Sequence, residues 1–166
     1  MEKNQQQQQQ QATGEGPVGI APCEHCGQPS HKRCSRCKAF SVCRQACMVA
    51  VWPKHQPDCD SVVNARKQIN RRTLDVYDKY GVKEPPGRGS TMDVDKKLDF
   101  FLEMLKVHDL SSPENKDLTQ SEKMLMNCCF NNTYRHAAGT FTASEFDTLK
   151  ALMRAHQVGV SNQPPK

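Results

Sequence analysis

Eight Cys and His residues at the spacing of metal ligands lie between positions 23 and 59 of this 166-residue chain, and His25 and His31 fall outside this pattern. In chain order the eight are Cys23, Cys26, Cys34, Cys37, Cys43, Cys47, His55 and Cys59. Thiolate and imidazole groups hold structural zinc in closed four-coordinate sites, and eight of them fill two such sites without remainder. The segment is therefore predicted to bind two zinc ions. Because neither site leaves a position for water or substrate, the pattern argues against metal-assisted catalysis.

The spacing of these residues indicates which neighbouring cysteines reach the same ion. The Cys-x2-Cys steps at 23–26 and 34–37 let two sulfurs of one tight turn reach the same ion. The step from Cys43 to Cys47 does the same from one turn of helix, because residues four apart lie on one helical face. One site is then all-thiolate and the other combines three thiolates with His55. Spacing alone leaves sequential and interleaved pairings open.

A disulfide framework is the alternative use of so many cysteines, since small secreted modules are often stapled in this way. The cluster holds seven cysteines, which is an odd number, and residues 1–22 contain no apolar stretch typical of a secretory signal. We therefore expect a reducing, intracellular location, in the nucleus, the cytoplasm or both, and zinc in preference to disulfides.

The segment 23–59 resembles a MYND-type zinc finger. The similarity lies in Cys34-Ser35-Arg36-Cys37-Lys38-Ala39, in Cys43-x3-Cys47 and in Trp52-Pro53-Lys54-His55-x3-Cys59. The resemblance implies an interleaved pairing, with Cys23, Cys26, Cys43 and Cys47 on one zinc ion and Cys34, Cys37, His55 and Cys59 on the other. Each ion then spans both halves of the segment, so loss of one site is expected to unravel the other.

The same resemblance implies that the finger binds proteins, because such modules dock short proline-containing peptides on a shallow groove near the Trp. We therefore expect Met48, Val51 and Trp52 to bind a partner. The residues Met48-Val49-Ala50-Val51 stand where family members carry polar Gln and Asp, which predicts a more apolar groove. Trp52 has a second interpretation of equal weight, as the hydrophobic cap of a module too small to build a core.

The remainder of the chain is divided into flanking regions by its composition. Residues 1–22 include the polyglutamine run Gln5–Gln11 and are expected to form a disordered tail, as are residues 159–166. Residues 60–89 are predicted to be a basic helix and a Pro/Gly linker, with the helix over 61–80 ended by Gly81 and packed in part on the finger. Residues 90–158 are predicted to be an all-α domain.

Two kinds of local signal define the helices of that domain. An apolar stripe predicts a helix over about 92–108, capped by Ser90 or Thr91, with Asp93 and Asp95 in its first turn. Two capping boxes, Thr119-x2-Glu122 and Thr142-x2-Glu145, predict that further helices begin there.

Residues 118–155 also bear a weak resemblance to a degenerate EF-hand, with Tyr134 to Glu145 spaced like its calcium loop. Gly139 and Glu145 match loop positions six and twelve. The positions that supply calcium ligands hold Tyr134, His136 and Ala138, which offer no carboxylate, so no calcium binding is predicted. An ordinary antiparallel helix pair is the alternative interpretation.

The sequence thus predicts a zinc-stabilised module with short helices and a minimal hairpin, followed by an all-α region. The predicted function is a non-catalytic protein–protein interaction adaptor in transcriptional or signalling regulation, with no membrane contact. Positive charge concentrates in residues 32–88, within a net charge of +5, and keeps a nucleic-acid-binding regulator as one alternative. A RING-like ubiquitin ligase is another, since it also uses eight interleaved ligands. A methyltransferase is excluded because no stretch carries the motifs of a SET domain.

Overall fold

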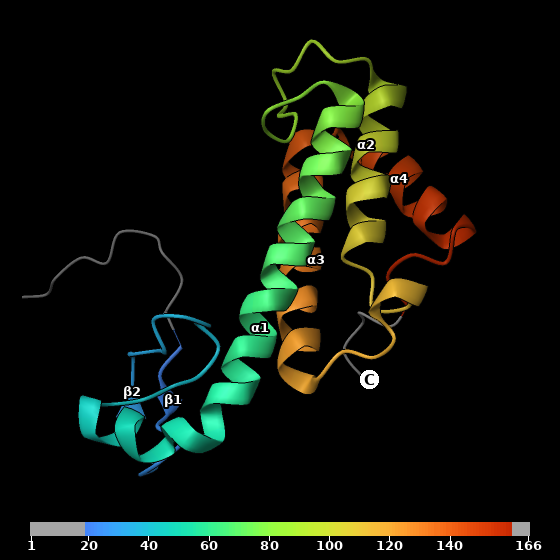
Figure 1. Ribbon diagram of the computed structural model, residues 1–166. Coiled ribbons are helices and arrows are strands. Elements are labelled where there is room, and N and C mark those ends of the chain that lie inside the picture. The colour runs from blue at the N-terminus through green and yellow to red at the C-terminus, as the bar shows by residue number, and fades with distance from the viewer. Residues whose placement is uncertain (1–18, 161–166) are drawn as a thin grey trace, which may run out of the picture.

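The computed structural model describes residues 19–160, which form a small finger followed by a group of helices (Figure 1). The elements are β1 (Ala21–Pro22), β2 (Pro29–Ser30), α1 (Gln45–Tyr80), α2 (Val94–Val107), a 3-10 turn (Pro113–Asn115), α3 (Gln120–Thr140) and α4 (Ala143–Ala155). The two strands pair antiparallel, with Ala21 opposite Ser30. The predicted fold class, a metal-binding module with a minimal hairpin and an all-α region, is confirmed.

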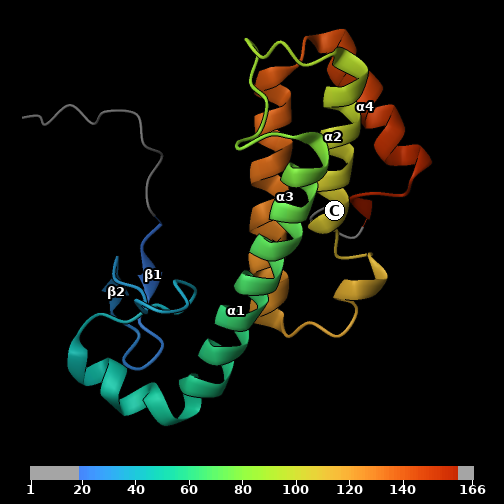
Figure 2. The same cartoon turned by 45° about the horizontal axis from the view of Figure 1, so that its top comes forward.

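Helix α1 joins the two parts of the molecule. It runs for 36 residues without interruption, so the expected start of a helix at 61 is wrong and the boundary between 59 and 60 falls inside α1. Pro53 and Pro57 lie within it. Each removes one backbone hydrogen bond and crowds the preceding turn, which bends a helix. Figure 2 shows α1 turning sharply between the finger and the bundle. The helix ends at Gly81 as predicted, in the left-handed conformation at φ 67°.

Helix α2 is the centre of the helical region, because it packs against α1, α3 and α4. Its side chains Phe100, Phe101 and Leu105 are almost fully buried, and Phe130 of α3 and Leu149 of α4 join them in one core. Burial of each such side chain contributes roughly 1.5–3 kcal/mol. Val76 of α1 lies in the same core, so the second half of α1 is part of the bundle.

The helix caps agree with the sequence at two of three positions. Both capping boxes are present. The Thr119 and Thr142 hydroxyls accept from the backbone N–H three residues on, and the Glu122 and Glu145 carboxylates accept from the backbone N–H of these threonines. At α2 the cap is Asp93, whose carboxylate accepts from the N–H groups of Asp95 and Lys96. The expected cap at Ser90 or Thr91 is therefore wrong. A carboxylate at this position also interacts favourably with the helix dipole.

The EF-hand interpretation of residues 134–145 is wrong, because these residues do not form a calcium-type loop. Helix α3 continues to Thr140, so Tyr134, His136 and Ala138 are helical, and only Phe141 and Thr142 separate α3 from α4. Ala137 is fully buried, which gives this part of the helix a packing role that a loop would not have.

The predicted tails fall mostly outside the described residues, at 1–18 and 161–166. Where the structure does describe them, they are ordered by contacts. Residues 21–22 form β1, and the second tail begins at Gly159, directly after Val158 of the bundle core. The N–H of Gly159 donates to the Asp109 carboxylate at 3.1 Å. Among the described helices, none is both long and apolar enough to cross a membrane.

Candidate metal centre

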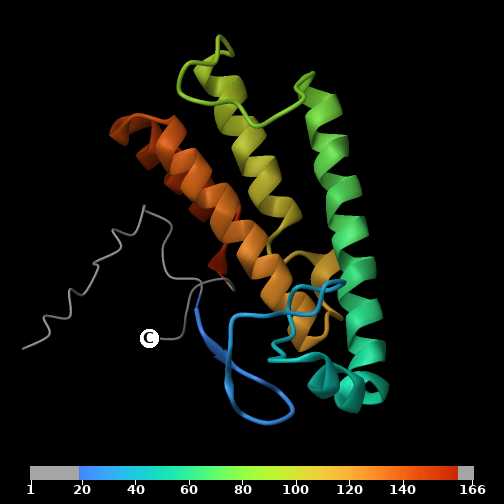
Figure 3. The same ribbon diagram turned by 90° about the vertical axis from the view of Figure 1, so that its left-hand side faces the viewer.

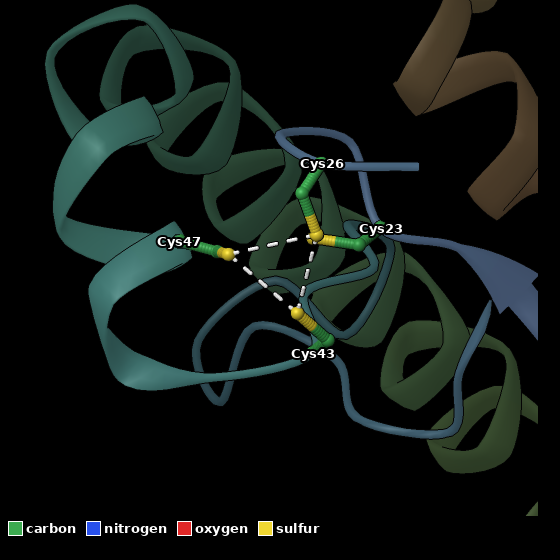
Figure 4. Close-up of side chains that lie close together, drawn as sticks. All are labelled: Cys23, Cys26, Cys43 and Cys47. Atoms are coloured by element: carbon green, nitrogen blue, oxygen red, sulfur yellow. Dashed lines mark hydrogen bonds between the residues drawn. The ribbon is translucent and has the colours of Figure 1, made fainter. Parts of the chain in front are cut away.

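The first metal-binding group consists of Cys23, Cys26, Cys43 and Cys47, whose sulfur atoms all lie within 4.8 Å of one another. Figure 4 shows the four sulfurs converging, with Cys47 projecting from a helix and the others from loops. Three of the Sγ–Sγ distances are 3.5, 3.5 and 3.8 Å. Four sulfurs bound tetrahedrally to zinc at about 2.3 Å are separated by about 3.8 Å. The spacing therefore fits one zinc ion.

The second group consists of Cys34, Cys37, His55 and Cys59 and is buried throughout. The Sγ atoms of Cys34 and Cys59 are 3.8 Å apart, and Cys37 Sγ is 3.6 Å from His55 Nε2. Zinc bonds of about 2.3 Å to sulfur and 2.0–2.1 Å to nitrogen predict an S–N separation of about 3.6 Å. The two groups are interleaved along the chain, and together they fit the two zinc ions that the sequence predicts.

Two backbone turns of the same design present the Cys-x2-Cys pairs. In each turn the carbonyl of the first Cys accepts from the residue after the second Cys, Gly27 in one and Lys38 in the other, at 2.8 and 2.9 Å. Both of these residues adopt the left-handed conformation, at φ 72° and φ 60°. The turn aims two thiols in one direction, and a residue with positive φ closes it.

Helix α1 carries ligands of both metal-binding groups. Cys47 lies in its first turn, and His55 and Cys59 lie one turn apart farther along the same helix. The first group therefore contains the start of α1, where the helix dipole favours anionic ligands such as thiolates. Because both groups include residues of α1 and of the preceding loops, each metal ion fastens the loops to the helix.

Bringing four thiols together separates their pKa values. A hydrogen bond from the backbone N–H of Cys26 lowers the pKa of Cys23 to about 6, whereas hydrogen bonds with the thiols of Cys26 and Cys47 raise the pKa of Cys43 to about 12. Like charges at such distances cannot all ionise unless a cation compensates them. A divalent ion provides that compensation, so the donor set requires a metal for its fully ionised state.

The second group behaves in the same way under deeper burial. Burial raises the pKa of Cys59 to about 12. Burial also opposes the ionisation of Cys34, but hydrogen bonds from the Cys37 backbone and the His55 side chain lower its pKa to about 6. In both groups the thiols lose their protons at different pH when no cation compensates them, and a bound metal ion favours the thiolate form of every cysteine.

Aromatic side chains orient the histidine ligand. The His55 ring stacks on Phe40 with centroids 3.9 Å apart, and Trp52 meets it edge-on at 5.9 Å. The second ring nitrogen, Nδ1, is buried and has no hydrogen-bond partner among the described residues. Packing therefore fixes the ring in place of the hydrogen bond that a metal-bound histidine usually makes. Trp52 belongs to the cluster around Cys34, Cys37 and Cys59, which supports its role as a hydrophobic cap.

Sequence reasoning missed the residues that fasten the finger to the bundle. Ser61 of α1 donates to the Glu122 carboxylate of α3 at 2.5 Å, and Ser121 donates to the Asp58 carboxylate at 2.7 Å. Leu125 of α3 packs on the cluster around the second group. These partners lie about sixty residues apart, and no local pattern connects them.

Three arginines of the basic stretch, residues 32–88, make contacts within the chain. Arg66 donates to backbone carbonyls of the finger, and Arg72 donates to the Asn115 side chain and the Val107 carbonyl. Their guanidinium groups are therefore engaged internally. Arg36 pairs with Asp60 at 2.7 Å. Part of the positive charge in residues 32–88 thus serves the fold.

Comparison with known proteins agrees with this geometry. Residues 23–59 match the family model described as the MYND finger. Comparison of the chain with curated proteins and with solved structures gives no match. The matched residues begin at the first ligand and end at the last. Residues 23–59 are therefore a MYND finger built on two interleaved zinc-binding groups.

Proposed function

We propose that this protein is a non-catalytic adaptor in transcriptional or signalling regulation, and that its finger docks a short peptide of a partner protein on Met48, Val51 and Trp52. A MYND finger is a zinc-binding interaction module, which supports the general part of the proposal. The position of this apolar segment supports the specific part. Residues 48–52 lie between Cys47, a ligand of the first group, and His55, a ligand of the second.

The residues of the proposed docking surface pack on both metal-binding clusters and remain partly exposed to solvent. Met48, Val51 and Trp52 are half-buried, and Val49 beside them is 64% exposed. Trp52 and Met48 pack on the cluster around the second group, and Val51 and Met48 pack on the cluster around the first. A surface rigid before binding loses little conformational entropy when a partner binds. Tryptophan at such a surface offers a large apolar area together with a polar N–H group.

The apolar character of the segment favours a proline-containing peptide with apolar neighbours. Proline-rich segments are already extended before binding and pack well on aromatic side chains. The two metal groups use four protein ligands each, so neither offers a position for a substrate. This supports a binding role over a catalytic one.

Fluorescence provides a direct test, because Trp52 is the sole tryptophan of the chain. Titration with an apolar proline-containing peptide library is expected to yield sequences that change its emission and saturate. Met48→Ala should weaken the binding of those peptides measured by calorimetry. Leu74→Ala is the matched control, since Leu74 is 58% exposed on the same helix but lies in the bundle half. Equal effects of the two variants, or a library without a saturating peptide, would contradict the proposal.

Trp52→Ala separates the two roles of this residue. Loss of peptide binding with two zinc ions retained would support docking by Trp52. Loss of zinc together with peptide binding would assign Trp52 to packing around the second group.

A further inference from the structure

A cleft of 310 Å³ lies between α1, α2 and α3, on the bundle rather than on the finger. Figure 3 shows α1 and α3 diverging on either side of α2. Phe100, Phe101 and Met104 of α2 line this interhelical cleft. Met48, Val51 and Trp52 are not among the residues that line the cleft. It is therefore a separate feature from the proposed peptide surface.

The wall of the interhelical cleft differs from the rest of the chain in its content of charged side chains. Among the described residues that line it, none is Lys, Arg, Asp or Glu, although such residues make up 25% of the chain. The hydrogen-bonding groups are instead neutral side chains, including Asn70 and Thr73 of α1 and Asn132 and Thr133 of α3. A larger hollow of 650 Å³ elsewhere includes Arg72, Lys106, Asp109 and Glu114 in its lining. The absence of charge is thus a property of this cleft and not of the bundle surface in general.

A buried histidine contributes to the wall of the cleft. His108, at the C-terminal end of α2, is 4% exposed. Its Nε2 lies 3.5 Å from Thr73 Oγ1, and its Nδ1 lies 3.2 Å from Thr133 Oγ1. The ring therefore connects α1 with α3 and uses both nitrogens. Burial, together with the charge of Arg72, lowers the pKa of His108 to about 4, so the imidazole is neutral at physiological pH.

We propose that the interhelical cleft binds a neutral small molecule with a flat apolar body and one hydroxyl or carbonyl group. The aromatic lining suits the apolar body, and the threonine and asparagine side chains suit the single polar group. The volume is near the lower end of the roughly 300–1,000 Å³ typical of ligand pockets, which limits the ligand to a small one. A charged ligand would leave water without gaining an opposite charge from the wall, which disfavours it.

A pair of probes that differ mainly in charge tests this proposal on the full zinc-loaded chain. The probes are 2-naphthol, which is neutral, and 2-naphthoate, which carries a carboxylate on the same ring system. The pH is set above neutrality, where ordinary histidines are uncharged. Protein-observed NMR is expected to show saturable shifts at Thr133 and Tyr77 with 2-naphthol and a dissociation constant about tenfold or more weaker for 2-naphthoate.

Two neighbouring cysteines provide a matched pair of variants. Cys129 lines the cleft, whereas Cys128 is exposed and lies outside it. Cys129→Phe fills the cleft and should weaken 2-naphthol binding about tenfold or more, while Cys128→Phe should leave it unchanged. If Cys129→Phe does not fold, magnetisation transfer from 2-naphthol protons to the Met104 methyl group of the unmodified protein decides the question. Equal binding of both probes, shifts confined to the finger, or absence of transfer to Met104 would overturn the proposal.

Discussion

The guanidinium group of Arg66 donates a hydrogen bond from Nη2 to the carbonyl oxygen of Cys37, at 2.7 Å. Its Nη1 donates to the carbonyl of Arg36 at 3.3 Å. Arg66 lies in α1 beyond the last metal ligand, yet it binds the turn that presents Cys34 and Cys37 to the second zinc-binding group. One side chain thus connects the bundle half of α1 with the metal centre.

Removing the Arg66 side chain is expected to destabilise the finger. Arg66→Ala leaves two carbonyls without their charged donor, and hydrogen bonds to charged groups contribute about 1.5–3 kcal/mol when well formed. Because Arg66 is only half-buried, we expect a loss of about 1–2 kcal/mol in the free energy of unfolding of the zinc-loaded protein. Trp52 fluorescence during denaturant unfolding measures it. Lys67→Ala, at the exposed neighbouring position, removes the same charge and serves as the control; an equal loss in both variants would contradict the assigned role.

Removal of zinc is expected to open the finger and leave the bundle folded. The finger has few buried apolar side chains apart from its ligands, so chelation removes most of what holds residues 23–59 together. The core around Phe100, Phe101 and Leu105 contains no metal ligand. Amide hydrogen exchange before and after chelation should show loss of protection over 45–59 and retained protection over 98–105. Loss of protection in both segments would show that the bundle depends on zinc.

The left-handed conformation of Lys38 predicts a stabilising substitution. A residue with a side chain pays roughly 1–2 kcal/mol for this conformation, and Gly27 occupies the equivalent place in the other turn. Lys38→Gly should therefore raise the free energy of unfolding by about 1 kcal/mol, after allowance for the larger entropy of glycine in the unfolded chain. Lys38→Ala removes the charge but keeps the strain, so it should change stability little. A lower stability for Lys38→Gly than for Lys38→Ala would be inconsistent with this explanation.

Burial of His108 predicts a dependence of stability on pH. Its pKa is lowered from 6.5 to about 4 in the folded protein, so between these values the unfolded chain binds the proton more readily. The stabilisation is complete above about pH 6.5 and is lost as the pH falls towards 4, with a full effect of up to about 3 kcal/mol.

The non-titrating variant His108→Gln isolates this effect. Unfolding free energies of both proteins are measured against pH at saturating zinc, so that protonation of the metal ligands affects them equally. The unmodified protein should lose more stability than His108→Gln between pH 6.5 and 4. Parallel curves for the two proteins would exclude His108 as the group responsible.

The features that the sequence predicts correctly are those specified by neighbouring residues. The ligands of both zinc groups lie within 37 residues, and their types and spacing carry the chemistry. The capping boxes at Thr119 and Thr142 and the stop at Gly81 involve residues at most four apart. Each of these signals acts within one turn of backbone, so tertiary structure has little influence on it.

The features that the sequence does not predict depend on tertiary contacts. Pro53 and Pro57 normally break a helix, but here His55 and Cys59 belong to a metal group that holds the bent segment in place. Gly139 fits a loop pattern, yet the burial of Ala137 against the bundle keeps α3 helical. The contact of Ser61 with Glu122 joins residues far apart in sequence, and periodicity or spacing cannot predict such a pairing.

The central claim, that two zinc ions take the place of a hydrophobic core in residues 23–59, is tested most directly by native mass spectrometry of the purified protein. The mass of the folded chain should exceed that of the denatured chain by two zinc ions, and Cys128→Ser should leave this difference unchanged, because Cys128 lies outside both groups. Cys59→Ser should lose the ion of the second group and, because the two groups are interleaved, should also weaken retention of the first. A difference of one zinc ion or none in the unmodified protein would contradict the account.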